Sequence, residues 1–135
     1  NVTGTGYNLA GGTAGNIDLG NYRVDDNAIR EHIEAILALP SVDVEAIREC
    51  RFHVALDGVN STGGMALPPL LKALGVNRVT ELYCDPSGHF PHNPEPLKEH
   101  LGAICEKVLE EKADLGIVVD PDVDRLAFIT EDGEM

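Results

Sequence analysis

Hydrophobic residues recur at the spacing of amphipathic helices in three segments of the chain. Their apolar positions are Ile29, Ile33, Ile36 and Leu37; Leu67, Leu70, Leu71 and Leu74; and Leu97, Leu101, Ile104, Val108 and Leu109. The first helix is predicted to be capped by Asp25 or Asp26. Gly75 is predicted to close the second helix, and Asn93 to cap the third. A short additional helix is predicted over residues 41–47.

Four short apolar runs, residues 52–57, 78–84, 115–119 and 126–130, have the length and composition of strands. Predicted helices separate the first three runs, and such crossovers join parallel strands. The link between the third and fourth runs is too short for a crossover, so the last strand is expected to be antiparallel on an edge. The pattern predicts an α/β fold: a three-layer α/β/α arrangement with an open four-stranded mixed sheet in the order 2-1-3-4.

Two stretches of the chain differ in composition. Residues 1–24 are rich in Gly, Asn and Thr without a period, and we interpret them as an irregular lead-in or interdomain linker. Residues 25–135 are interpreted as one α/β domain that ends in an aspartate-rich loop and a hairpin. The chain begins without Met and stops after "EDGEM", so we expect it to be a fragment of a larger protein.

The net charge limits the kinds of partner that the chain is expected to bind. With 10 Lys and Arg against 23 Asp and Glu, the chain carries a formal charge of −13 at pH 7. Nucleic acids and anionic membranes bind basic surfaces, so this composition argues against both as partners. It is compatible with a divalent cation or a basic neighbouring domain.

The cysteines indicate a reducing environment. Cys50, Cys84 and Cys105 are odd in number and widely spaced, so they suggest neither a zinc site nor a disulfide framework. No signal peptide and no apolar run of roughly 18 residues is evident. We therefore expect a cytoplasmic location.

The segment "GIVVDPDVDRLAF" contains the most informative cluster. Asp120, Asp122 and Asp124 follow the third predicted strand, at the sheet edge where open α/β folds bind ligands. In an extended strand, positions i and i+4 lie roughly 13 Å apart, so the three carboxylates can share a hard cation such as Mg²⁺ only if the chain curls there. Pro121 permits such a departure from the strand. The alternative interpretation is that the three aspartates are solvated residues of a turn.

Other residues near this edge have less specific patterns. Arg125 either neutralises the aspartates or binds phosphate bidentately, and the sequence leaves both roles open. The backbone N–H groups of "DGVNSTGG" are suited to binding an anion, but the favoured interpretation is that this segment is a structural turn. His89 and His92 have no third ligand at metal spacing, so they are interpreted as structural or surface histidines.

These segments together resemble a known family. "DPDVDR" after an apolar strand resembles the metal-binding loop of the α-D-phosphohexomutases, the phosphoglucomutase/phosphomannomutase family, with proline in place of the usual glycine. "ALDGVNSTGG" and "HFPHNPEP" resemble further segments of the same domain, in family order. The resemblance covers residues 50–133 and implies the second of four domains.

The resemblance also implies functional roles. Asp120, Asp122 and Asp124 would hold Mg²⁺, and Arg125 would reach toward phosphate in a cleft shared with other domains. The remaining metal ligand would be a phosphoserine on the first domain, which passes its phosphate to a hexose phosphate. Pro91 stands where the serine of that family motif would be, so the nucleophile is not expected in this chain. The partners implied are a phosphosugar substrate and the other domains of the enzyme.

Two other classes of function are compatible with the aspartate cluster. One is a haloacid-dehalogenase-like Mg²⁺-dependent phosphatase, whose strand-end Asp-x-Asp binds the metal. The other is a non-catalytic, cation-dependent interaction module. The sequence does not identify the sugar, because the contacts to it would lie in other domains.

Overall fold

The structure is a computed structural model that describes residues 24–135. Its helices are α1 (Ala28–Leu37), α2 (Val44–Cys50), α3 (Thr62–Ala73), the 3₁₀ helix η1 (Lys98–His100) and α4 (Gly102–Glu111). Its strands are β1 (His53–Asp57), β2 (Arg78–Leu82), β3 (Leu115–Val119) and β4 (Leu126–Thr130). The lead-in predicted for residues 1–24 lies, apart from Val24, outside the described residues.

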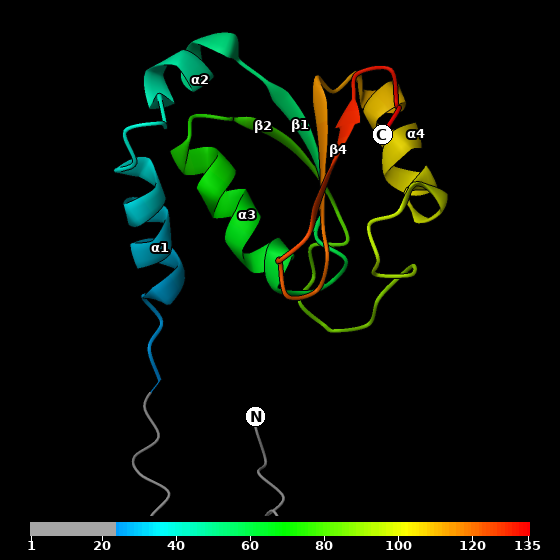
Figure 1. The fold of residues 1–135 in the computed structure, drawn as a ribbon, viewed down its shortest axis with the longest axis horizontal. Helices are drawn as coiled ribbons and strands as arrows, with labels where there is room; N and C mark the ends of the chain where they lie inside the picture. The colour runs from blue at the N-terminus through cyan, green and yellow to red at the C-terminus, as the bar shows by residue number, and fades with distance from the viewer. Residues whose placement is uncertain (1–23) are drawn as a thin grey trace, which may run out of the picture.

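The four strands form one mixed sheet in the order β2-β1-β3-β4 (Figure 1). β1 is parallel to both β2 and β3, whereas β3 and β4 are antiparallel, with Ile117 opposite Phe128. The predicted order and directions are therefore confirmed. The carboxyl ends of β1, β2 and β3 meet at one edge of the sheet, which brings the loops that follow them together.

Helices cover both faces of the sheet, as predicted. α4 packs on one face and α3 on the other, with α1 against the outer side of α3 (Figure 1). On the α4 face, Ile104 and Val108 pack with Val118 and Ile129. β4 alternates accordingly: Ala127 and Ile129 are buried while Leu126 and Phe128 are exposed. The other buried cluster joins the residues Val54, Leu56, Leu71 and Val76.

Three predicted helix starts were wrong. Asn27, rather than Asp25 or Asp26, is the N-cap of α1, and the Asp25 carboxylate accepts a hydrogen bond from the Asn27 N–H. The short helix begins after Asp43, whose side chain accepts a hydrogen bond from the Ala46 N–H. Side-chain hydrogen bonds of this kind determine where a short helix begins, and apolar spacing does not locate them.

The third helix begins eight residues later than a cap at Asn93 would place it. α4 starts at Gly102, and the Asn93 side chain instead accepts a hydrogen bond from the Glu95 N–H within a loop. Leu97 and Leu109, predicted for the buried face, are 47% and 53% exposed. The residues between Asn93 and α4 instead form a loop and the 3₁₀ helix η1.

The end of α3 at Gly75 was predicted correctly. Gly75 has φ +91°, and its N–H donates to the carbonyl of Lys72. The Val76 N–H donates to the carbonyl of Leu71, which completes a Schellman motif. A residue with a side chain would be strained at this φ.

Candidate functional site

Three loops meet at the carboxyl edge of the sheet and are tied to one another by hydrogen bonds. The Ser61 hydroxyl, at the start of α3, donates to the carbonyl of Pro121 at 2.7 Å. The Asn60 side-chain amide donates to the carbonyl of His89 at 3.0 Å. The turn after β1 thus connects the loop after β2 to the loop after β3, and the site is assembled from all three.

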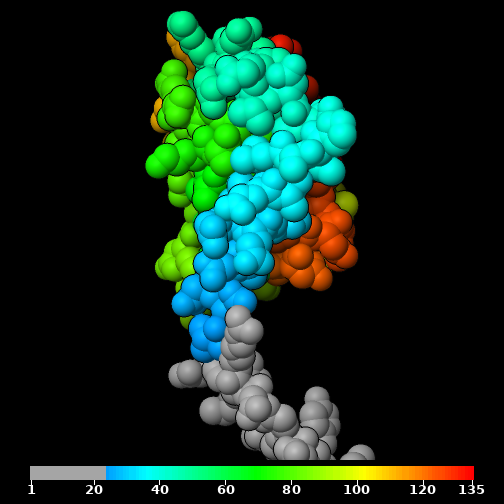
Figure 2. Space-filling model, turned by 90° about the vertical axis from the view of Figure 1, so that its left-hand side faces the viewer, coloured from blue at the N-terminus to red at the C-terminus, as the bar shows by residue number. Residues whose placement is uncertain are grey.

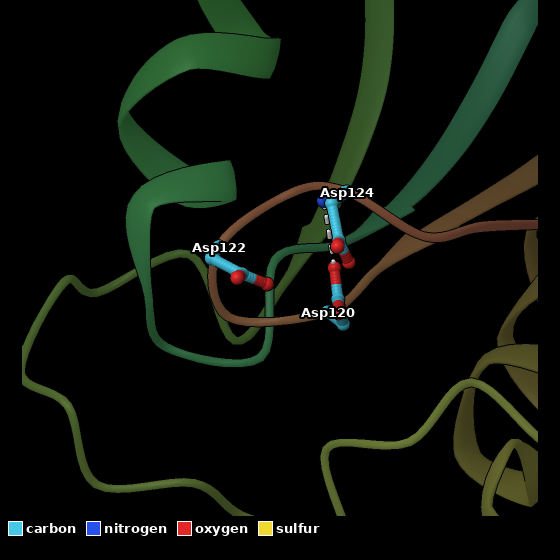
Figure 3. A group of neighbouring side chains, drawn as sticks. All are labelled: Asp120, Asp122 and Asp124. Carbon is cyan, nitrogen blue, oxygen red and sulfur yellow. Dashed lines mark hydrogen bonds between the residues drawn. The ribbon is translucent and has the colours of Figure 1, made fainter.

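The loop after β3 curls around the side chain of its first aspartate (Figure 3). The Val123 N–H donates to the carbonyl of Asp120 at 3.2 Å, and Val123 adopts φ +63°, which is uncommon for a β-branched residue. The N–H groups of Asp124 and Arg125 both donate to Asp120 Oδ1 at 3.1 Å. This turn is the departure from the strand that three converging carboxylates require.

The three aspartates converge as a result. One oxygen from each of Asp120, Asp122 and Asp124 can be chosen so that all three lie within 4.8 Å of one another (Figure 3). Asp120 is buried, whereas Asp122 and Asp124 are exposed. An all-oxygen, acidic donor set with two members open to solvent fits a hard divalent cation.

The surroundings of Asp124 and Asp120 shift the pKa values of these two carboxyl groups in opposite directions. The pKa of Asp124 is raised by its close contact with the Asp120 side chain and by the charges of Asp122 and Asp120. Burial acts to raise the pKa of Asp120, but hydrogen bonds from the Arg125 N–H and its neighbours, with the charge of Arg125, hold it below the ordinary value. A bound cation would relieve the repulsion that Asp124 experiences.

Arg125 is engaged by three carboxylates. Its Nε lies 3.2 Å from Asp120 Oδ2 and 3.5 Å from Asp124 Oδ1. Its Nη1 contacts Glu95, which comes from the loop after β2. The sequence assigned no role to Glu95, although it lies in the "NPEP" segment that supported the resemblance. Arg125 therefore cross-links two loops, and half of its side chain stays exposed to a ligand.

A second pairing missed in the sequence joins His92 to the end of β1. His92 Nε2 lies 3.0 Å from Asp57 Oδ2, and His92 Nδ1 donates to the Asn93 carbonyl. Asp57 is 1% exposed, and its pKa is raised by burial despite the Val59 N–H and His92. The His92 ring also meets Tyr83 edge to face. His92 is a structural histidine that anchors the loop carrying Glu95.

Removing this anchor is expected to destabilise the domain. His92→Ala leaves the buried Asp57 carboxylate with only the Val59 N–H, so the free energy of unfolding should fall by about 2 kcal/mol. Urea denaturation at pH 7 measures the change. His89→Ala is the matched control, because the exposed His89 ring makes no hydrogen bond, ion pair or ring contact with a described residue, and its effect should stay within about 0.5 kcal/mol. Equal decreases in the free energy of unfolding for the two substitutions would contradict the anchoring role of His92.

The turn of "DGVNSTGG" is structural, as the favoured interpretation held. The N–H groups of Gly58 and Asn60 donate to the carbonyls of Leu82 and Tyr83, at the end of β2. Those of Val59, Ser61 and Gly64 are bonded to Asp57 Oδ1, the Gly58 carbonyl and the Ser61 carbonyl, respectively. Most of the backbone donors that an anion would need are thus already used.

A hollow of about 410 Å³ borders the aspartate loop on its α1 side. Asp122 and Val123 form one wall, and residues of α1 and α3 such as Ile33 and Leu67 form the others. On this face of the molecule the loop, drawn in orange, lies beside α1, drawn in blue (Figure 2). Because its lining is mostly apolar, the hollow is unsuited to a phosphate group, and the polar chemistry lies on the side of the loop where the aspartates converge.

Comparisons with known proteins identify the family to which the chain is similar. Residues 30–133 match the family model for phosphoglucomutase/phosphomannomutase, alpha/beta/alpha domain II. A phosphoglucomutase/phosphomannomutase of Thermococcus kodakarensis is 43% identical over 117 residues, which are 86% of this chain and 25% of the relative. A probable phosphoglucosamine mutase of Methanopyrus kandleri is 37% identical over 111 residues, 82% of this chain and 23% of the relative.

Solved structures show the same fold. A phosphoglucomutase/phosphomannomutase family protein of Burkholderia thailandensis aligns with a TM-score of 0.66 at 32% identity, covering 79% of this chain and 22% of the other. A putative phosphomannomutase of Thermus thermophilus aligns with a TM-score of 0.68 at 24% identity, covering 84% of this chain and 26% of the other, and supports the fold alone. No helix among residues 24–135 has the length and apolar character to cross a membrane. The chain spans about a quarter of the length of the curated relatives it matches; it belongs to the phosphoglucomutase/phosphomannomutase family and comprises the α/β/α domain II of that family.

Proposed function

We propose that this chain is the Mg²⁺-binding domain of a phosphohexomutase that interconverts hexose 1-phosphate and hexose 6-phosphate through a phosphoserine. The observation that supports it most is the convergence of Asp120, Asp122 and Asp124 at the carboxyl edge of the sheet, beside Arg125. The family and the donor set agree with this role. In such a site, bound Mg²⁺ offsets charge on the transferring phosphoryl group.

The residues of this chain have separate roles in that function. Asp120 supports the curled loop, since its Oδ1 accepts two backbone N–H groups. Its Oδ2, which lies 3.2 Å from Arg125 Nε, would exchange that contact for a cation. The exposed Asp122 and Asp124 complete the acidic donor set. Arg125 binds a phosphate oxygen pair with its planar guanidinium, exchanging a carboxylate contact for the phosphate.

The remaining parts of the reaction are assigned to other domains. Pro91 precedes His92 and Asn93, so no serine nucleophile occurs at this point, and the isolated chain should be inactive as a mutase. The substrate is a phosphosugar, and the relatives include both a phosphoglucomutase/phosphomannomutase and a probable phosphoglucosamine mutase. We expect the protein in the cytoplasm, in line with three free thiols at Cys50, Cys84 and Cys105.

The chain should bind Mg²⁺ weakly, because the proposed phosphoserine ligand is absent from it. Isothermal titration calorimetry at pH 7 should give a small saturable heat that disappears in Asp122→Asn. Asp132→Asn is the matched control, since Asp132 is an exposed aspartate of the turn after β4 and should leave the heat unchanged. The affinity should decline as the pH is lowered toward the raised pKa of Asp124, because protons then compete with the metal.

The same measurements separate the proposal from its alternatives. Tight binding unaffected by Asp122→Asn would contradict the metal site. Mutase turnover by the purified chain would contradict the assignment of the nucleophile to another domain. Phosphatase turnover by the purified chain would favour a haloacid-dehalogenase-like enzyme.

A further inference from the structure

A basic cavity lies at the end of the sheet opposite the aspartate loop. It measures about 410 Å³ and is lined by Arg48, Arg51, Phe52, Gly75, Asn77 and Arg78. These residues come from the end of α2, the segment leading into β1, and the connection from α3 to β2 (Figure 1). The cavity therefore faces away from the proposed metal site and is separated from it by the length of the strands.

The positive charge here is unusual for this chain. The chain carries a net charge of −13, yet three of its ten Lys and Arg residues line this one cavity. Arg48 is paired with Glu45 on its own helix. The guanidinium groups of Arg51 and Arg78 make no hydrogen bond or ion pair with any residue in the described range 24–135. The cavity thus carries about two uncompensated positive charges.

The local backbone holds these arginines around the hollow. Arg51 ends α2 in the left-handed region, with φ +54°, and its N–H donates to the carbonyl of Arg48. A Cβ on Gly75 would lie 2.9 Å from Arg48 Cβ and 3.2 Å from Arg48 Nε, so the arginine stem packs against the bare glycine backbone. The Asn77 side chain donates to the Gly75 carbonyl and fixes the opposite wall. Arg78 then begins β2.

We propose that this cavity binds the phosphate group of a small phosphate monoester. The planar guanidinium groups of Arg51 and Arg78 match the paired oxygens of phosphate, and the dianion balances their two charges. The Phe52 ring, 39% exposed, provides an apolar surface for the organic part of the molecule. The volume of about 410 Å³ fits a small phosphorylated metabolite. This site is independent of the metal site in the proposed function.

The test is a titration of the ¹⁵N-labelled 135-residue chain, followed by NMR, with inorganic phosphate and with glucose 6-phosphate in parallel. We expect saturable shifts of the Gly75 and Asn77 amides, with tighter binding of the ester. Arg51→Gln and Arg78→Gln should each weaken binding about 10-fold. Arg51→Lys and Arg78→Lys retain the positive charge but lose the planar guanidinium that contacts two phosphate oxygens. They should weaken binding less than the glutamine substitutions do. A native-like spectrum of each variant establishes that it is folded.

Lys112→Gln is the matched control for non-specific attraction. Lys112 is an exposed cation at the end of α4 that also adopts a positive φ, of +53°, and makes no ion pair with a described residue. Its substitution should leave the dissociation constant unchanged. Equal weakening of phosphate binding by Lys112→Gln and Arg51→Gln would overturn the proposed phosphate site. Amide shifts that never saturate would overturn it as well. Shifts confined to residues 120–125 would also overturn it, and would leave the proposed function intact.

Discussion

Arg125→Lys in the full-length protein is expected to lower kcat/KM for hexose phosphate by about 10-fold or more. Lysine keeps the positive charge that faces Asp120 and Asp124, but it cannot present two parallel N–H groups to phosphate. It also cannot hold Glu95 and a phosphate oxygen at the same time. Steady-state kinetics at saturating Mg²⁺ measures the loss, and the Mg²⁺ dependence should stay normal.

Arg30→Lys is the control for this experiment. Arg30 is exposed on α1 and pairs with Glu34, so its substitution should leave the kinetics unchanged. If Arg125 only neutralises the aspartates, Arg125→Lys will retain wild-type kinetics. Under that alternative, Arg125→Gln will tighten Mg²⁺ binding to the isolated chain, because one repelling charge is gone. Either result would contradict the proposal that Arg125 binds phosphate.

Gly64→Ala is expected to reduce the free energy of unfolding by about 3 kcal/mol. A Cβ at this position would lie 2.4 Å from the Cys84 carbonyl oxygen and 2.7 Å from Cys84 Cα. Because these atoms are backbone, no side-chain rotation relieves the contact, and α3 must move away from the end of β2. Urea denaturation followed by circular dichroism measures the change.

Gly102→Ala is the matched control for Gly64→Ala. Gly102 also lies in the first turn of its helix, but a Cβ there would meet nothing within 4 Å. Alanine is the better helix former by about 1 kcal/mol, so this variant should be neutral or slightly more stable. Similar destabilisation by both substitutions would show that the packing of α3 against Cys84 is not the cause.

Much of the fold was predictable from local pattern. The runs predicted at residues 52–57, 78–84, 115–119 and 126–130 contain the four strands, because short runs rich in apolar and β-branched residues between turn signals admit few alternatives. Chain connectivity then determined the strand directions, since helical crossovers give parallel pairs and a six-residue loop does not. The candidate aspartates and Arg125 were identified in the same way, because they directly follow β3.

The contacts between loops were not predictable in this way. Glu95 and Arg125 are 30 residues apart, Asn60 and His89 are 29 apart, and Ser61 and Pro121 are 60 apart. Each contact depends on how a loop extends after its strand, and no periodicity in the sequence describes that. The late start of α4 shows the same limit, because Asn93 forms a local loop hydrogen bond where a helix cap was expected.

The sequence by itself determined the α/β class, the strand order, the acidic cluster and the family, because these depend on local spacing and on residue types close together in the chain. Only the tertiary structure decided that the Asp120 side chain closes the loop, that His92 anchors Asp57, and that three arginines line a cavity at the far end of the sheet. The physical reason is that these features depend on distances between segments remote in sequence. Packing of the helices on the sheet sets those distances, and a one-dimensional pattern does not contain them.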